Sequence, residues 1–293
     1  MALTTLFDQP GKLGACLRLM RVDRPIGTYL LLWPTLMALL LATEGWPDLK
    51  NVLIFIAGTF LMRSAGCVIN DFADRDFDGD VERTEGRPLA TGELQASDAL
   101  KLAAGLSVLA FGLVLLTNIQ TILLSLAAVM VAALYPFMKR VTQWPQLVLG
   151  IAFSFGIPMA FTAEGAPLTQ IVWLLFATNV LWTIAFDTFY AMVDREDDLR
   201  IGIKSTAILF GRYDRLITTA LQVVVIGLLL ALAEIAHLHW PFYVGVGVSA
   251  LMFIYQQRLL ASRVSANYFK AFLHNHWVGA CWFVSLVVER VLF

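Results

Sequence analysis

Two groups of acidic residues in this sequence have the composition and spacing of a divalent-metal site. Each group places three polar residues at intervals of four, which on a helix brings them to one face, about 6 Å apart. The residues at this spacing are Asn70, Asp74 and Asp78 in the first group and Tyr190, Asp194 and Asp198 in the second. Hard divalent cations prefer oxygen ligands, and Mg²⁺ usually binds one or two carboxylates together with a substrate phosphate. If the helices continue through the groups, two carboxylate faces can oppose each other across a cavity.

Basic residues close to both groups indicate a partner that carries phosphate. Arg63 precedes Asn70 by seven residues, about two helical turns deeper on nearly the same face. Arg87 follows the first group. Lys139, Arg140 and Lys204 belong to the same side of the chain's membrane-spanning bundle, which is derived below. Carboxylates together with Lys and Arg are what a Mg²⁺-bound diphosphate requires. One Asp-rich loop is usually only a solvated surface, but two loops at matched spacing favour a site.

The elements that position these residues are membrane-spanning helices. Hydrophobic residues make up 59% of the 293 residues and charged residues 15%, against roughly 45–50% and roughly 25% in soluble domains. A helix needs about 20 apolar residues to cross a bilayer. The apolar stretches predict nine spans, at 26–42, 51–70, 99–117, 119–137, 145–162, 168–190, 216–235, 240–257 and 272–291. The predicted fold class is therefore all-α, a polytopic membrane protein.

The distribution of basic residues predicts the orientation of these spans. Of the 21 Lys and Arg residues, all but three lie on one side; Lys50 and Arg290 lie opposite, and Arg63 is inside the second span. The positive-inside rule places the N-terminus and the long loops near 71–98 and 191–215 in the cytoplasm. The remaining connections are too short for a soluble domain, so residues 1–293 are expected to form a single intramembrane domain.

Composition argues against several other classes of protein. The net charge of −1 gives no reason to expect a nucleic-acid partner. Cys16, Cys67 and Cys281 are far apart in apolar surroundings, unlike a disulfide framework or a zinc site. His274 and His276 are two residues apart, which splays them on a helix and argues against a metal-ligand pair.

The acidic groups make the chain similar to the intramembrane aromatic prenyltransferases. Their two signature motifs resemble Asn70-Asp71-x-x-Asp74-x-x-x-Asp78 and Asp187-x-x-Tyr190-Ala-x-x-Asp194-x-x-x-Asp198. The stretches YPFMKR at 135–140 and GIKSTA at 202–207 are more specific, and resemble the members that prenylate 4-hydroxybenzoate in bacterial ubiquinone biosynthesis. The similarity runs from about residue 19 to residue 279.

The resemblance implies about nine helices around a central cavity capped by the two long loops, in the bacterial inner membrane with the active site facing the cytoplasm. It implies Mg²⁺ as cofactor and, as substrates, a polyprenyl diphosphate and 4-hydroxybenzoate. The allylic C–O bond breaks toward a carbocation, which the ring carbon ortho to the hydroxyl attacks.

Site residues follow by position in the motifs. The metal ligands implied are Asn70, Asp74, Asp78, Asp194 and Asp198. The catalytic residues implied are Asp71, Asp74, Asp187 and Asp194. The substrate-binding residues implied are Arg24, Arg63, Arg87, Tyr135, Lys139, Arg140, Tyr190 and Lys204. Arg24 is assigned to the carboxylate of the acceptor, with Arg140 as second choice, and the general base is either Asp187 or the diphosphate itself.

Three alternatives remain open. The acceptor of such an enzyme can be a naphthoate, homogentisate, a porphyrin or a glycerol phosphate. A divalent-cation or proton-coupled transporter can also use carboxylates, but it needs polar groups at the midplane and a path to both faces. A non-catalytic membrane scaffold has no need of two matched acidic groups.

Overall fold

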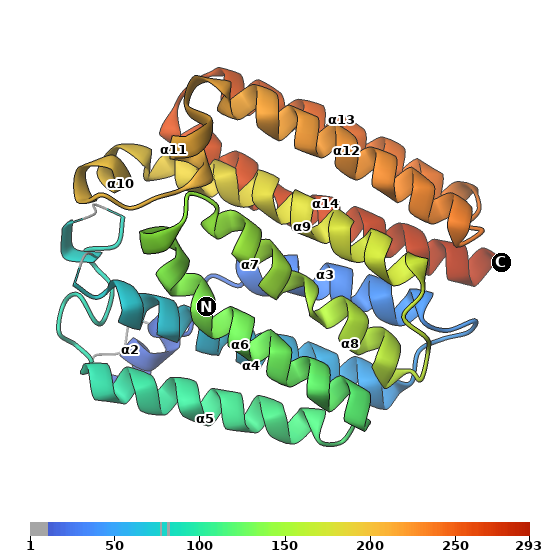
Figure 1. Cartoon of the computed structure of the whole chain (residues 1–293), viewed down its shortest axis with the longest axis horizontal. Helices are drawn as coiled ribbons and strands as arrows, with labels where there is room; N and C mark the ends of the chain where they lie inside the picture. The colour runs from blue at the N-terminus through green and yellow to red at the C-terminus, as the bar shows by residue number, and fades with distance from the viewer. Residues whose placement is uncertain (1–10, 77, 81–82) are drawn as a thin grey trace.

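The computed structural model describes residues 11–76, 78–80 and 83–293, and every regular element in these residues is a helix (Figure 1). The longer helices are α3 (Ile26–Leu41), α4 (Leu49–Asp74), α5 (Ala96–Val114), α6 (Ile119–Val141), α7 (Pro145–Ser154), α9 (Gln170–Val193), α12 (Asp214–Ile235), α13 (Trp240–Ala261) and α14 (Ser265–Leu292). The shorter ones are α2 (Lys12–Leu19), η1 (Asp78–Asp80), α8 (Gly156–Ala163), α10 (Arg195–Ile201), α11 (Thr206–Phe210) and η2 (Gly211–Tyr213).

The predicted membrane bundle of about nine helices is confirmed. Within the described residues, eight helical segments are long and apolar enough to cross a bilayer, with α7 and α8 acting as one segment. The remaining predicted span, at 26–42, corresponds to α3, which has 16 residues and a length of about 24 Å, somewhat less than the hydrocarbon thickness. The chain is a multi-pass membrane protein.

Helix α4 and helix α9 both end inside the acidic groups. Helix α4 ends at Asp74 and is followed by the short η1, while α9 ends at Val193 and α10 begins at Arg195. The condition that one helix continues through each group is therefore not met. The negative end of the helix dipole disfavours carboxylates beyond the last turn, whereas a new helix start favours them. In α10 the acidic residues Glu196, Asp197 and Asp198 occupy the first turn.

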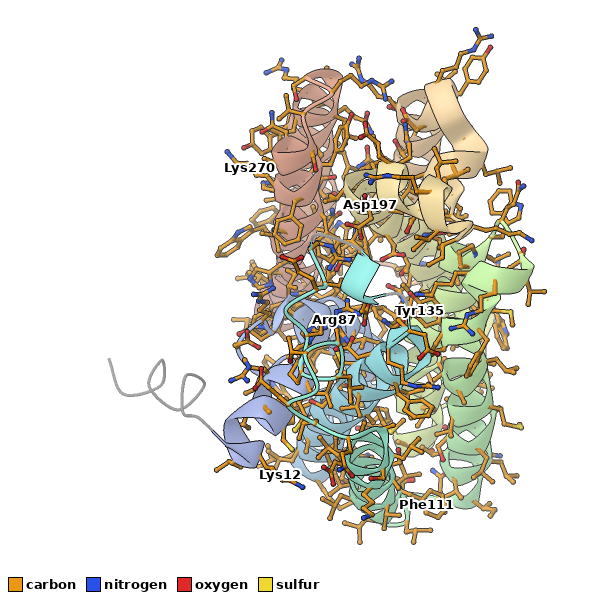
Figure 2. The ribbon with its side chains drawn as sticks, turned by 90° about the vertical axis from the view of Figure 1, so that its left-hand side faces the viewer. Lys12, Arg87, Phe111, Tyr135, Asp197 and Lys270 are labelled. Atoms are coloured by element: carbon orange, nitrogen blue, oxygen red, sulfur yellow. The ribbon has the colours of Figure 1, made fainter. Side chains whose placement is uncertain are left out.

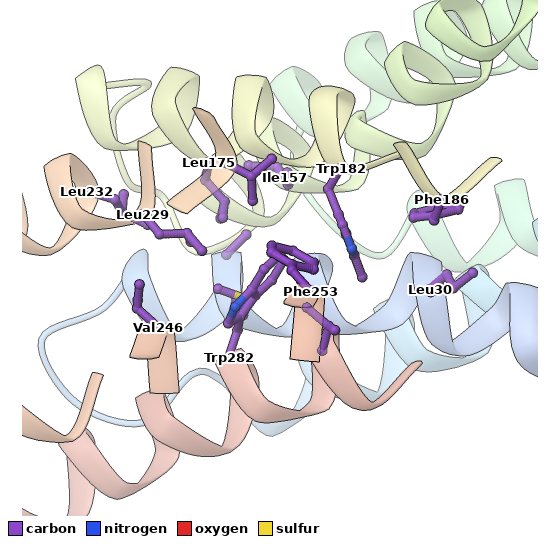
Figure 3. Packing of buried hydrophobic residues seen from close by; sticks show 14 of the residues in the cluster. Leu30, Ile157, Leu175, Trp182, Phe186, Leu229, Leu232, Val246, Phe253 and Trp282 are labelled. Carbon is purple, nitrogen blue, oxygen red and sulfur yellow. The ribbon is translucent and has the colours of Figure 1, made fainter. Parts of the chain in front are cut away.

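The two sides of the bundle are packed differently. Helices α3, α8, α9, α12, α13 and α14 enclose a continuous apolar core, in which the rings of Trp182 and Trp282 lie 4.8 Å apart between centroids (Figure 3). Helices α3 and α8 touch closely at Gly156, where a Cβ atom would lie 2.5 Å from Oγ1 of Thr35. Only 22% of the span in α5 and 17% of the span in α6 are buried, against 56% in α9. Helices α5 and α6 therefore act as walls rather than as core.

Both acidic groups lie at the same end of the bundle. This end, called the cap end below, carries α2, η1, α10 and α11, while the C-terminus lies at the opposite, far end (Figure 1). The two long segments predicted to form a cap therefore meet here, which brings residues more than 100 positions apart into contact.

Candidate functional site

A single cavity joins the cap end to the membrane interior. It has a volume of about 1140 Å³, slightly above the usual range of small-molecule sites. Its cap-end wall contains every predicted site residue except Arg140. Its deeper wall is formed by α4, α5 and α6, with apolar residues such as Met62, Phe111 and Val129, and it reaches Thr117 and Thr121 near the far end. The cavity is thus charged at one end and mainly apolar along the rest of its length.

Most carboxylates of the first group are buried and paired with basic residues. Nη1 of Arg87 lies 2.9 Å from both carboxylate oxygens of Asp78 and 3.0 Å from Oδ1 of Asp71. Nη2 of Arg21 donates to both oxygens of Asp71, at 3.0 and 2.8 Å. Because its two oxygens are already held by two guanidinium groups, Asp71 is better placed to orient the end of α4 than to bind a ligand directly.

Asp74 occupies the centre of the first group. Its Oδ2 accepts hydrogen bonds from Nζ of Lys139 and, at 3.2 Å, from Nδ2 of Asn70. Its Oδ1 is buried and has no hydrogen-bond partner among the described residues. A buried carboxylate oxygen without a donor costs free energy unless a ligand satisfies it. Asp74 is therefore a strong candidate to bind a cation.

The second group is held by a residue from the first loop. Nε of Arg83 lies 2.9 Å from Oδ1 and 3.1 Å from Oδ2 of Asp194, in a bidentate pair. The same guanidinium stacks over the ring of Tyr190, 4.6 Å from the centroid. Asp194 is 13% exposed, against 2% for Asp71. The second group is thus more open to solvent than the first.

Helix α6 supplies three of the predicted site residues at its cap end. Tyr135 and Lys139 are four residues apart, on one face, and both line the cavity. Figure 2, which views the molecule from the cap end, labels Tyr135 together with Arg87 and Asp197. Lys204 lies beside the end of this helix, because its backbone N–H donates to the carbonyl of Lys139 at 2.9 Å and its Nζ to that of Val141 at 3.2 Å.

Arg63 lies deeper than the other basic residues. Its guanidinium packs against the backbone of α3 at Gly27, where a Cβ atom would lie 2.1 Å from Nε. Its Nη1 contacts Sγ of Cys67, and its Nε is buried without a hydrogen-bond partner among the described residues. An arginine held in the membrane with so few acceptors is costly. Arg63 therefore has the donors that an anionic ligand in the cavity needs.

Asp187 lies on α9 in the wall of the same cavity. Gln146, at the start of α7, lines the cavity as well. Its Oε1 accepts a hydrogen bond from the backbone N–H of Thr206 at 3.0 Å. Gln146 therefore links the start of α7 to the segment that carries Lys204.

The two residues predicted for the acceptor carboxylate are placed differently. Arg24 lines the cavity at its mouth, and its largely exposed side chain pairs with Asp23 at 3.3 Å. Arg140 points elsewhere: its Nη2 donates to the backbone carbonyl of Ala73, and it is not among the residues that line the cavity. The structure therefore brings Arg24, but not Arg140, to the site.

Burial changes the acidity of two carboxyl groups outside the membrane spans. Burial raises the pKa of Asp78 to about 6, in spite of the opposing charge of Arg87. Burial together with the neighbouring charge of Asp194 raises the pKa of Asp198 to about 7. Both groups are less acidic than usual because burial disfavours the ionised carboxylate more than the nearby basic residues favour it, so a cation at either group would stabilise the ionised form.

Sequence reasoning did not assign Arg21, Arg83 or Gln146 to the site. Arg21 and Arg83 are ordinary members of basic segments, and nothing in the spacing distinguishes them from neighbours such as Arg18. Gln146 carries a weak signal, as a polar residue directly after the proline that begins a predicted span. Arg21 and Arg83 each bind a motif carboxylate that is distant in sequence, and Gln146 binds the backbone of Thr206, so their roles depend on the fold.

Comparison with known proteins identifies the family. Residues 31–279 match the model of the UbiA prenyltransferase family. The chain belongs to this family. It is 56% identical over 275 residues to the 4-hydroxybenzoate octaprenyltransferase of Pseudomonas aeruginosa. The aligned residues make up 94% of this chain and 93% of that protein.

Solved structures of UbiA homologues share the fold. The apo homologue from Aeropyrum pernix K1 has a TM-score of 0.80 at 26% identity, over 89% of this chain and 97% of its own. A homologue from Archaeoglobus fulgidus bound to DMAPP and Mg²⁺ has a TM-score of 0.73 over 95% of this chain and 99% of its own. At 18% identity, this second likeness shows the fold alone.

The donor set of this UbiA chain fits a hard divalent ion. Within the described residues, no three His, Cys, Asp or Glu side chains lie close enough together to hold a metal. Asp74, Asp78 and Asp194 are instead each paired with a basic residue. The candidate ligands nevertheless supply only oxygen atoms, one of which, Oδ1 of Asp74, is buried without a donor. This is the chemistry that Mg²⁺ prefers.

Proposed function

We propose that this UbiA protein transfers a polyprenyl group from polyprenyl diphosphate to 4-hydroxybenzoate, in a Mg²⁺-dependent reaction of ubiquinone biosynthesis. The new bond forms at the ring carbon ortho to the hydroxyl, and diphosphate is released. The observation that carries the proposal is one cavity with both acidic motifs and their basic partners at one end and an apolar wall along the rest. The high identity to 4-hydroxybenzoate octaprenyltransferases supports the choice of acceptor.

The motif residues divide between metal and substrates. We assign the metal to Asn70, Asp74, Asp78, Asp194 and Asp198. We assign the diphosphate to Arg63, Arg87, Lys139 and Lys204, with hydrogen bonds from Tyr135 and Tyr190. A Mg²⁺–diphosphate complex offers a cation to the carboxylates and oxygens to the basic groups. The pairs Asp74–Lys139 and Asp194–Arg83 can therefore exchange their present partners for this complex without leaving a charge uncompensated.

The arrangement accounts for each step of the transfer. The carboxylates of Asp74 and Asp194 would hold Mg²⁺, which would supply positive charge to the diphosphate that leaves when the allylic C–O bond breaks. Lys139 and Arg63 stabilise the same developing charge through hydrogen bonds. The apolar wall of α4, α5 and α6 accommodates the prenyl chain and keeps water from the carbocation. The ring carbon then forms the C–C bond, and the ring proton leaves to Asp187 or to diphosphate.

Arg24 is our candidate for the carboxylate of 4-hydroxybenzoate. It lines the mouth of the cavity, and its partner Asp23 is a single, exposed contact. We propose that residues 1–293 form one intramembrane domain in the bacterial inner membrane. In this domain the segments 71–98 and 191–215 cap the cavity on the cytoplasmic side.

The test is a transfer assay with purified protein in detergent. Labelled 4-hydroxybenzoate and geranyl diphosphate are incubated with and without Mg²⁺, and label is followed into an organic-extractable product. The expected result is Mg²⁺-dependent product that is lost in Asp74→Ala and Asp194→Ala. Product from a different aromatic acceptor only would overturn the substrate. No product from any acceptor, in folded protein, would overturn the reaction and favour transport.

A further inference from the structure

Asp214 is a fully buried carboxylate that does not belong to the cavity. It is the first residue of α12, and its side chain has no solvent exposure. It accepts hydrogen bonds from Nη2 of Arg195, from Nη1 of Arg263 at 2.8 and 2.9 Å, and from the backbone N–H of Arg215. The start of a helix favours a carboxylate. A helix start takes only one side-chain acceptor for its free backbone N–H groups, so it does not by itself explain a fully buried carboxylate that also binds two guanidinium groups.

The two arginines come from two different segments next to the cavity. Arg195 directly follows Asp194 and begins α10, which also carries Asp198. Arg263 lies in the turn between α13 and α14, just before Ser265 and Ala266, which line the cavity. Asp214 therefore connects the second acidic motif with the rim formed by α14, through contacts that do not include the site itself.

The backbone at Arg263 supports a specific role for this contact. Arg263 has φ of 54°, in the left-handed region that Gly and Asn occupy more readily than Arg. Nε of Arg195 is buried without a hydrogen-bond partner among the described residues, so this side chain depends on Asp214 for its charge compensation. Both arginines thus accept a local cost in order to reach the same carboxylate.

We infer that Asp214 is a positioning residue for the second acidic motif: through Arg195 it holds the start of α10, and thereby Asp194, at the cavity mouth. The inference rests on the proposed function, because it assumes that Asp194 acts on a metal–diphosphate complex. Without Asp214, the ion pair that still ties the start of α10 to another segment among the described residues is the one between Asp194 and Arg83.

The experiment compares three variants of the full chain in detergent, Asp214→Asn, Arg195→Gln and Arg263→Gln, by two measurements. Hydrogen exchange of residues 194–203 in ligand-free protein reports the anchoring of α10. Binding of Mn²⁺ in the presence of inorganic diphosphate, followed by electron paramagnetic resonance, reports the metal site. Arg263→Gln is the matched control, because it removes a guanidinium from the same carboxylate on the side away from the motif.

Asp214→Asn and Arg195→Gln are expected to speed exchange in residues 194–203 and to weaken Mn²⁺ binding by about tenfold, the usual effect of losing an outer partner of a metal ligand. The double variant Asp214→Asn with Arg195→Gln is expected to bind Mn²⁺ no more weakly than Asp214→Asn alone. Arg263→Gln is expected to lower the melting temperature while leaving Mn²⁺ binding within about twofold of wild type.

Equal effects of Arg195→Gln and Arg263→Gln on Mn²⁺ binding would overturn the inference, because Asp214 would then only stabilise the fold. Unchanged exchange in residues 194–203 would also overturn it. If Asp214→Asn does not fold, the two arginine variants decide the question. If wild-type protein binds no Mn²⁺ with diphosphate, the proposed metal site fails, and the exchange measurement still decides whether Asp214 anchors α10.

Discussion

The two acidic motifs have the same spacing in the sequence but different environments in the structure. In the first motif, Asp71 and Asp74 lie in the last turns of α4 and are nearly inaccessible to solvent. Asp71 is paired with Arg21, and Asp74 is paired with Lys139 of α6. In the second, Asp194 lies between α9 and α10, is partly exposed, and depends on Arg83. The carboxylates of Asp71 and Asp74 are thus more deeply buried than that of Asp194. Equal spacing of ligands therefore does not imply equal burial or equal contribution to stability.

The largest expected effect tests whether both motifs are needed for chemistry. Asp74→Asn and Asp194→Asn each remove one charge from a proposed metal ligand. Each is expected to lower the rate of prenyl transfer by at least about 100-fold, since a metal contributes several kcal/mol to the transition state. Transfer assays over a range of Mg²⁺ concentrations measure the effect. A variant of either motif that retains near wild-type activity would show that only one motif holds the metal.

The two motifs are expected to differ more in their contribution to the free energy of unfolding than in their contribution to activity. Arg87→Gln removes the guanidinium that pairs with the buried Asp78 and is expected to cost about 3 kcal/mol. Arg83→Gln removes a partly exposed contact from Asp194 and is expected to cost about 1 kcal/mol. Thermal unfolding of both variants in detergent, without ligands, measures the difference. Equal losses would contradict the view that the more deeply buried ion pair of the first motif contributes more to stability.

The dependence on pH should also differ between the motifs. Metal binding requires ionised carboxylates, and the pKa is raised to about 6 for Asp78 and to about 7 for Asp198. The Mg²⁺ concentration for half-maximal activity is therefore expected to fall about tenfold as the pH rises from about 5.5 to 7.5. Asp78→Asn should remove the lower part of this dependence and Asp198→Asn the upper part.

The same shifts give the sign of the effect on stability. Because the folded-state pKa values lie above those of the unfolded chain, the folded protein binds more protons between about pH 4 and 7. Raising the pH through this window should destabilise the ligand-free protein, and Mg²⁺ should restore the loss. Melting temperatures measured across this range, with and without Mg²⁺, check both statements; a rise in ligand-free stability with pH would contradict them.

The smallest expected effect concerns the contact between Gly27 of α3 and Arg63 of α4, the helix that carries the first motif. Gly27→Ala places a Cβ atom where the Arg63 guanidinium now lies, and the flexible side chain can move away at little cost to stability. The KM for the diphosphate donor is expected to rise about fivefold, the equivalent of one hydrogen bond of about 1 kcal/mol. Gly105→Ala on α5, where a Cβ atom has no neighbour within 4 Å, is the matched control. Equal KM values for the two variants would remove Arg63 from the donor site.

Much of the fold could be predicted because membrane insertion depends on local composition. Each predicted span coincides with a helix or a pair of helices, since a run of apolar residues must satisfy its own backbone hydrogen bonds in lipid. Helices α4 and α9 end at Asp74 and Val193, a few residues beyond the predicted ends of these spans at 70 and 190. Spacing alone did not decide whether a helix continues through each acidic group, because water, opposite charges and the helix dipole compete there.

Sequence alone determined that this protein is a membrane bundle with two oxygen-rich motifs and a set of basic residues on one side, because composition and spacing are local properties. Only the tertiary structure decided which charges meet. It placed Arg21 and Arg87 on Asp71, Arg83 on Asp194 and Arg195 on Asp214, and it left Arg140 outside the cavity. Ion pairs between distant segments depend on how helices pack, and packing is set by the complementarity of whole surfaces rather than by the spacing of a few residues.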